Sequence, residues 1–182
     1  IVDSCLEDLL DKLGNKGYEI IVRPHPQEVR LKKEKMEILK QKYDSDDITI
    51  QTDFTSNNPV MEADLLITDW SGISWEYAFT TYRPILFIDT PMKVMNPEYQ
   101  KISTVPLNIL LRNKLGRSLD PGQTDKVVET VEYLIGHTAE YRKEIEMLSQ
   151  EYLFNPGFSA EVGAKYIIES IQKKISRKGA GA

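Results

Sequence analysis

Cysteine is nearly absent from the sequence: Cys5 is the only one among 182 residues. A single thiol excludes an internal disulfide and a metal site made of thiolates, and it fits a reducing cytoplasm. The chain also lacks a run of about 20 apolar residues, the length that a helix needs to cross a bilayer. Its first residues do not follow the basic-then-apolar order of a signal peptide. We therefore expect a soluble, cytoplasmic chain.

An excess of positive charge is missing as well, since 23 Lys and Arg are outnumbered by 28 Asp and Glu, for a net charge of −5. This balance argues against a nucleic-acid partner, although a local anion site remains compatible with it. The length suits one globular α/β domain. The chain begins at Ile1 without a methionine and ends in Gly-Ala-Gly-Ala. We expect a piece of a longer protein, with a domain at residues 1–178 and a tail or artificial remnant at 179–182.

Short apolar runs alternate with helical patterns along the chain. Strands are predicted at residues 18–22, 48–50, 65–67 and 85–88. Helices are predicted at residues 2–13, 31–43, 73–79, 124–135, 139–152 and 159–176, with an irregular segment at 91–121. Nearly continuous apolar strands indicate a sheet buried on both faces. The pattern predicts a Rossmann-like α/β fold with a doubly wound parallel sheet, which binds ligands beyond the carboxyl ends of its strands.

Unusual polar segments follow three of the four predicted strands. They are Arg23–Pro26, Thr68–Gly72 and Asp89–Pro91. Because the carboxyl ends of parallel strands share one edge of the sheet, we expect these segments to lie along that edge. The sequence therefore predicts the functional site there.

The segment Thr68-Asp69-Trp70-Ser71-Gly72 forms a short turn between a predicted strand and a predicted helix. The free N–H groups and the positive dipole end of a helix start favour a phosphate. Ser71 and Ser74 can add hydroxyl donors, and Gly72 allows an anion to approach the backbone. The alternative interpretation is that Asp69 or Ser71 caps the helix.

Two further residues of this edge carry candidate roles. His25 lies at a strand end beside Arg23, where its imidazole could exchange a proton or simply bond a loop carbonyl. Glu76 lies one turn into the helix, where it could accept ribose hydroxyls or pair with a neighbouring base. His137, the other histidine, is interpreted as a solvated linker residue.

Near the carboxyl terminus, Asn155-Pro156-Gly157-Phe158-Ser159 precedes a predicted long helix. Ser159 is then its N-cap, and the free N–H groups behind it offer a second place for a phosphate. The acidic residues form no recognisable metal constellation, so we predict no metal and no other cofactor.

Four segments together resemble the CDP-glycerol glycerophosphotransferase family. They are Ile21–Pro26 (IVRPHP), Asp64–Ala78 (DLLITDWSGISWEYA), Arg83–Pro91 (RPILFIDTP) and Asn155–Gly157 with Ser159. The likeness extends over most of the chain, in matching order and spacing.

The resemblance implies a GT-B architecture, in which two Rossmann-like domains face a cleft and the carboxyl-terminal one holds the donor CDP-glycerol. This chain corresponds to that carboxyl-terminal domain, without its first strand and without the amino-terminal acceptor domain. Members of the family transfer glycerol phosphate to a cell-envelope polymer or a lipid-linked acceptor, as in teichoic acid synthesis, at the cytoplasmic membrane face. The isolated chain is expected to be inactive, since the family's presumed catalytic base lies in the absent domain.

Carried over residue by residue, the resemblance assigns the catalytic histidine to His25 and donor or phosphate contacts to the other site residues. These contacts are Arg23, Thr68, Asp69, Ser71, Gly72, Ser74, Glu76, Gly157 and Ser159. Two alternatives stay open: a GT-B glycosyltransferase or sugar-nucleotide epimerase that uses a UDP-sugar, and a non-catalytic nucleotide-binding module.

Overall fold

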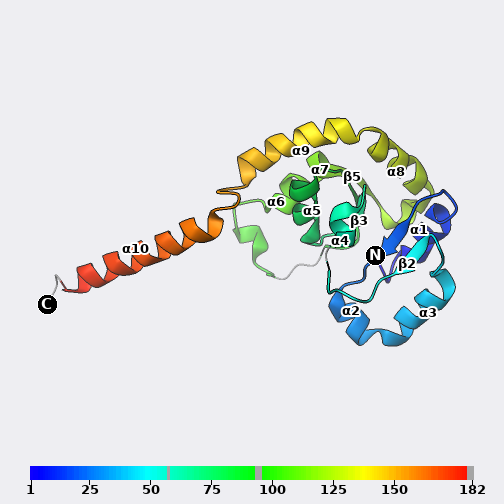
Figure 1. The fold of residues 1–182 in the computed structure, drawn as a ribbon, viewed down its shortest axis with the longest axis horizontal. Coiled ribbons are helices and arrows are strands. Elements are labelled where there is room, and N and C mark those ends of the chain that lie inside the picture. The colour runs from blue at the N-terminus through cyan, green and yellow to red at the C-terminus, as the bar shows by residue number, and fades with distance from the viewer. Residues whose placement is uncertain (57, 93–95, 180–182) are drawn as a thin grey trace. The chain divides into compact units, whose positions relative to one another are not determined.

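The computed structural model describes residues 1–56, 58–92 and 96–179 (Figure 1). The chain divides into two compact units, Ile1–Glu146 and Met147–Ala182. Parallel sheets and helices alternate in the first unit, which confirms the predicted Rossmann-like α/β class. Of the predicted tail, residues 180–182 lie outside the described residues. The prediction of one domain over residues 1–178 stays a prediction.

The strands are β1 (Ile20–Val22), β2 (Ile48–Ile50), β3 (Leu66–Thr68), β4 (Ile85–Ile88) and β5 (Gly116–Leu119). The helices of the first unit are α1 (Leu6–Leu13), α2 (Pro26–Leu31), α3 (Lys33–Tyr43), α4 (Asn58–Glu62), α5 (Ile73–Thr81), α6 (Leu107–Leu110), α7 (Arg112–Leu115) and α8 (Val127–Gly136), with 3-10 turns η1 (Tyr99–Lys101) and η2 (Pro121–Lys126). Helix α9 (Thr138–Tyr152) runs past the unit boundary, and α10 (Ser159–Gly179) belongs to the second unit.

The described strands pair in two parallel sheets, β1-β2 and β3-β4-β5. Helices α1, α2 and α3 lie beside the first sheet, and helices α5 and α7 lie beside the second (Figure 1). Within each sheet the strands run in the same direction, so their carboxyl ends meet at one edge. The segments after β3 and β4 are therefore neighbours, as the sequence predicts. Arg23–Pro26 instead follows β1, which belongs to the other sheet, so the three predicted segments do not share the edge of one sheet.

Helix α1 contributes to two hydrophobic cores at once. Leu9 and Leu13 pack in one core with β4, β5 and α8, whereas Leu6 and Leu10 pack in the other with β1, β2 and α3. All four leucines are at most 8% exposed. Leucines at helical spacing thus place α1 between the two sheets, and Ile20 of β1 packs against both cores.

Strand β4 is buried at every position, as its continuous apolar sequence predicts. Its neighbour β5 was not expected, because residues 91–121 look irregular and only Leu119 of the strand is strongly apolar. Gly116 makes the pairing possible. A Cβ at that position would lie 1.7 Å from the Ile85 carbonyl oxygen, so the two backbones approach too closely for any side chain.

We expect Gly116→Ala to destabilise the first unit by about 3 kcal/mol, since the methyl group meets backbone that cannot rotate away. Urea unfolding followed by circular dichroism measures the loss. Gly136→Ala is the matched control, because no atom lies within 4 Å of a Cβ built there. Equal midpoints for the two variants would contradict the close approach of β4 and β5.

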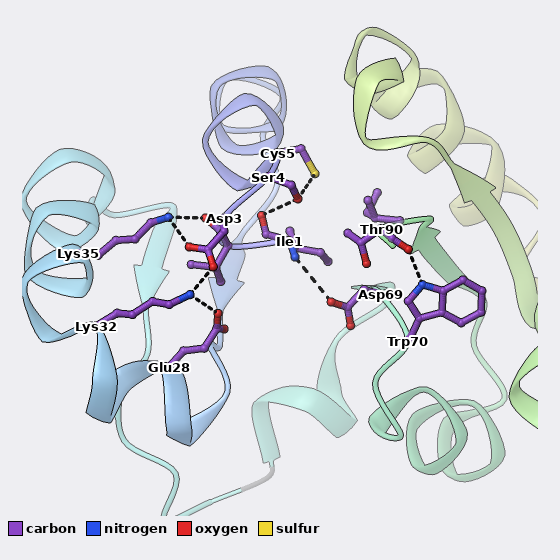
Figure 2. A network of polar contacts seen from close by, with 12 residues as sticks. Ile1, Asp3, Ser4, Cys5, Glu28, Lys32, Lys35, Asp69, Trp70 and Thr90 are labelled. Carbon is purple, nitrogen blue, oxygen red and sulfur yellow. Dashed lines mark hydrogen bonds and ion pairs between the residues drawn. The ribbon is translucent and has the colours of Figure 1, made fainter. Parts of the chain in front are cut away.

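Ion pairs join the start of the chain to the helices beside the first sheet. Asp3 accepts hydrogen bonds from Lys32 and, at 2.9 Å, from Lys35 (Figure 2). Lys32 also bonds Glu28 of α2 at 3.2 Å. The two lysines lower the pKa of Asp3 from 3.8 to about 2, with the Lys32 hydrogen bond as the largest cause.

This lowered pKa predicts an acid-sensitive share of stability. The Asp3 carboxylate stabilises the folded state above pH 3.8, and its contribution disappears as the pH falls towards about 2. Asp3→Asn should therefore be less stable than the wild type at pH 6 and equally stable near pH 2. Urea midpoints of the two proteins at both pH values measure this difference. If Asp3→Asn were still less stable than the wild type near pH 2, the loss of stability would not come from the Asp3 charge.

Candidate functional site

The turn after β3 leaves the start of α5 open. Gly72 occupies the N-cap position, and no described side chain caps the helix there. Neither Asp69 nor Ser71 therefore acts as the cap. Gly72 has an ordinary helical φ of −63°, and no atom lies within 4 Å of a Cβ built on it. The Ser74 and Trp75 N–H groups donate to the Ser71 and Gly72 carbonyls, at 3.3 and 3.1 Å. An anion at this helix start would therefore use the N–H groups that precede them.

The other predicted residues of this turn differ in accessibility. Thr68 ends β3 and is buried, whereas Ser71 and Glu76 are exposed. Ser74 is buried, and its hydroxyl donates to the Ser71 carbonyl at 2.9 Å. A phosphate would compete with that carbonyl for the Ser74 donor. The exposed Ser71 hydroxyl is the more accessible of the two.

Asp69 is directed away from the helix start. Its Oδ2 lies 3.6 Å from the amino group of Ile1 (Figure 2), and its main-chain carbonyl accepts a hydrogen bond from Arg112 at 3.0 Å. Trp70, the next residue, donates its indole N–H to the Thr90 carbonyl at 2.7 Å. These contacts connect the turn after β3 to the end of β4.

Arg112 is a central residue of this edge that the sequence analysis missed. Its side chain is 7% exposed, and it pairs with Asp89 at 2.8 Å. Its Cζ lies 4.0 Å from the ring centroid of Trp70 and 4.2 Å from that of Phe87. A basic residue directly after the apolar run Ile109-Leu110-Leu111 is the sequence signal that could have drawn attention to it.

His25 follows β1 and begins α2, which starts at Pro26 where a loop was expected. Its Nδ1 accepts a hydrogen bond from the Gln27 backbone N–H at 3.1 Å. Proline at the first helical position and an acceptor at the N-cap are both typical of a helix start. With Nδ1 used as an acceptor, the neutral imidazole carries its proton on Nε2. The exposed ring is thus prepared to donate from Nε2.

Arg23 is engaged with the loop that follows β2. Its Nη1 donates to the Ser56 carbonyl at 2.7 Å, and its guanidinium lies 5.4 Å from the Phe54 ring centroid. The residue therefore fixes two neighbouring strand ends of the first sheet. His137 stacks on Tyr133, with centroids 3.9 Å apart, and its Nδ1 lies 2.7 Å from the Tyr133 carbonyl. Its environment is more structured than that of a solvated linker residue.

Gly157 and Ser159 belong to the second unit. Phe158 donates its N–H to the Asn155 carbonyl at 2.9 Å, and Gly157 has φ +82°. Proline followed by a glycine with positive φ is the arrangement of a type II turn. The predicted N-cap role of Ser159 is wrong: α10 begins at Ser159 itself, so the N-cap position falls on Phe158, whose carbonyl accepts a hydrogen bond from the Val162 N–H at 3.0 Å. That Gly157 and Ser159 contact the same ligand as Ser71 stays a prediction.

Beyond this edge, the described residues could contain three further features: a metal site, a membrane-spanning helix or a pocket. No three His, Cys, Asp or Glu side chains there gather as a metal site, and no helix there is long and apolar enough to span a bilayer. A recess of about 320 Å³ contains none of the predicted site residues; it is lined by Arg117, Ser118, Leu119, Gln123, Lys126, Glu129, Thr130 and Tyr133. Acidic and basic groups both line it, so its charge selects no clear class of ligand.

Comparison with known proteins supports the resemblance seen in the sequence. Residues 3–102, more than half of the 182, match the family described as CDP-Glycerol:Poly(glycerophosphate) glycerophosphotransferase. The match covers His25, the turn after β3 and the end of β4, but not Gly157 or Ser159. No curated protein and no solved structure matches the chain. The chain belongs to the CDP-glycerol:poly(glycerophosphate) glycerophosphotransferase family.

Proposed function

We propose that this chain is the donor-binding domain of a CDP-glycerol-dependent glycerophosphotransferase. The observation that carries the proposal is the open start of α5, where Gly72 leaves space in front of a helix without a side-chain cap. This start lies at the carboxyl end of a parallel strand, where Rossmann-like folds bind nucleotides. The diphosphate of CDP-glycerol fits a positive helix end, and the family match supports the choice of donor.

In the proposed reaction, an acceptor hydroxyl attacks the phosphorus that bears glycerol. A new P–O bond to the acceptor forms while the bond to the bridging oxygen of the diphosphate breaks, and CMP leaves. Positioning and neutralisation of charge supply most of the catalysis in such phosphoryl transfers. The base that removes the hydroxyl proton belongs to an amino-terminal domain of a GT-B pair, and no metal is required in this proposal.

His25 acts in this proposal as an acid or an electrostatic donor. Because the Gln27 N–H holds Nδ1 as an acceptor, the imidazole offers Nε2–H to a phosphate oxygen. Ser71 and the backbone at Gly72 contact the diphosphate, Arg23 and Thr68 shape the strand ends, and Glu76 accepts ribose hydroxyls. The acceptor is a cell-envelope polymer or lipid-linked molecule, which places the full protein at the inner membrane face.

The first test is ligand binding by this chain. CDP-glycerol and CDP should raise its melting temperature above the effect of CMP and UDP-sugars, because a ligand that binds only the folded state contributes about 2.7 kcal/mol at one hundred times its Kd. Gly72→Ala is the diagnostic variant. It should change stability by less than about 1 kcal/mol, since a helical φ accepts alanine, yet weaken CDP binding because its methyl fills the approach to the backbone.

A preference for UDP-sugars would favour a glycosyltransferase or epimerase instead. Absence of binding to any of these nucleotides would favour a non-catalytic module and overturn the proposal. If Gly72→Ala binds CDP as the wild type does, the diphosphate does not sit at the start of α5.

The role of His25 is tested by His25→Asn in a protein that carries both domains of the pair. Asparagine keeps an acceptor for the Gln27 N–H, so stability should stay within about 1 kcal/mol of wild type. The rate of transfer from CDP-glycerol should fall by about 10²-fold or more, since the asparagine amide can donate a hydrogen bond but has no acidic proton to transfer. Transfer at the wild-type rate would remove His25 from the mechanism.

A further inference from the structure

Arg112 is enclosed by the strand ends that form the proposed donor site. Nε and Nη2 both donate to Oδ1 of Asp89, at 3.1 and 2.8 Å. Nη1 donates to the Asp69 carbonyl at 3.0 Å, and Nη2 also donates to the Ile88 carbonyl at 3.3 Å. A guanidinium has five N–H donors, so four of them are used by these protein acceptors.

The guanidinium of Arg112 also lies over two aromatic rings, 4.0 Å from the Trp70 centroid and 4.2 Å from the Phe87 centroid. Trp70 belongs to the turn after β3, and Phe87 belongs to β4. The Trp70 indole N–H extends the connection to Thr90, beyond the end of β4. Arg112 therefore holds, from α7, both the main chain and a side chain of the turn that leads into α5.

This geometry makes Arg112 unsuitable as a direct phosphate ligand. Its donors point to carbonyls and to Asp89, and its side chain is 7% exposed. Its effect on a ligand must act through the turn. A shift of the Asp69 carbonyl or of Trp70 would move Ser71 and Gly72, which follow immediately in the chain.

We propose that Arg112 is a positioning residue for donor binding: its hydrogen bonds to Asp69, Ile88 and Asp89 fix the turn that presents Ser71 and Gly72 to the diphosphate. The inference rests on the proposed function, because it takes the start of α5 as the donor's phosphate site. Lysine cannot replace Arg112, since an ammonium group offers neither the planar fork nor a flat surface that stacks on rings.

The chain offers a matched control at the opposite end of the same strands. Arg83 precedes β4 and donates to the carbonyls of Glu62 and Ala63, both at 2.7 Å, and lies 3.6 Å from Asp64. It too is an arginine that binds several carbonyls and one carboxylate. It lies at the amino ends of β3 and β4, so its loss should lower stability without moving the turn.

The experiment compares Arg112→Lys and Arg83→Lys in this chain by melting temperature, by the Kd for CDP and by amide hydrogen exchange at Ser74 and Trp75, whose N–H groups donate to the Ser71 and Gly72 carbonyls. Both variants should melt at lower temperature. Arg112→Lys alone should weaken CDP binding about tenfold or more, as misplaced binding groups do, and speed exchange in the turn about tenfold.

A second pair of variants keeps the test decisive if Arg112→Lys does not fold. The Asp89 side chain is 43% exposed, so substitutions there should be tolerated. Asp89→Ala removes an acceptor of Arg112 and should weaken CDP binding, whereas Asp89→Asn retains an acceptor oxygen and should preserve most of the affinity. Equal losses in Asn and Ala would overturn the positioning role.

The outcomes separate this inference from the function on which it rests. If the wild-type chain binds no cytidine nucleotide, the proposed function fails, and hydrogen exchange still decides whether Arg112 fixes the turn. If the wild type binds CDP and the Arg112 and Asp89 variants match it in affinity and exchange, the inference fails and the proposed function stands.

Discussion

The packing of α1 between two cores is the constraint on which the first unit depends. β1 and β2 form one hydrogen-bonded sheet, and β3, β4 and β5 form another. Among the described residues, no strand of one sheet pairs with a strand of the other, and side-chain packing around α1 joins the two sheets. Leu6 and Leu10 on one side of α1, and Leu9 and Leu13 on the other, supply that packing. The relative position of His25 and the turn after β3 therefore depends on α1 as well as on the strands.

Hydrogen bonds from two arginines then fix the loops at the strand ends, in addition to the apolar packing of α1. Arg23 fixes the loop after β2 at the end of β1, and Arg112 joins the ends of β3 and β4. Each donates to main-chain carbonyl oxygens at or beyond the end of a strand. The family match covers the segments that follow β1, β3 and β4. In the proposed function, Arg23 and Arg112 hold in place the turns that form most of the donor-binding surface.

Much of this edge was predictable, because the signals for it are local. Apolar runs gave the positions of β1 to β4, and polar turn residues after them gave the candidate site. Two features were not predictable in this way. β5 contains Gly116, Arg117 and Ser118, which carry no apolar pattern, and it forms only because Gly116 admits the Ile85 carbonyl. Arg112 acquires its role from partners 23 and 43 residues away in the chain, a relationship that spacing along the sequence does not reveal. The start of α2 at Pro26 was missed for another reason, since proline both ends a strand and begins a helix.

The uncapped start of α5 also bears on the speed with which ligands can exchange. Where a serine or aspartate caps a helix, an arriving anion must first displace that side chain, at a cost of about 1 kcal/mol. At Gly72 no capping side chain has to leave. A donor that entered and a nucleotide product that departed would therefore pass without displacing a capping side chain. Without a side-chain cap, the start of α5 depends on the backbone hydrogen bonds from Ser74 and Trp75 to Ser71 and Gly72. A bound anion would add to them, so the local order of the first turn would increase with occupancy of the site.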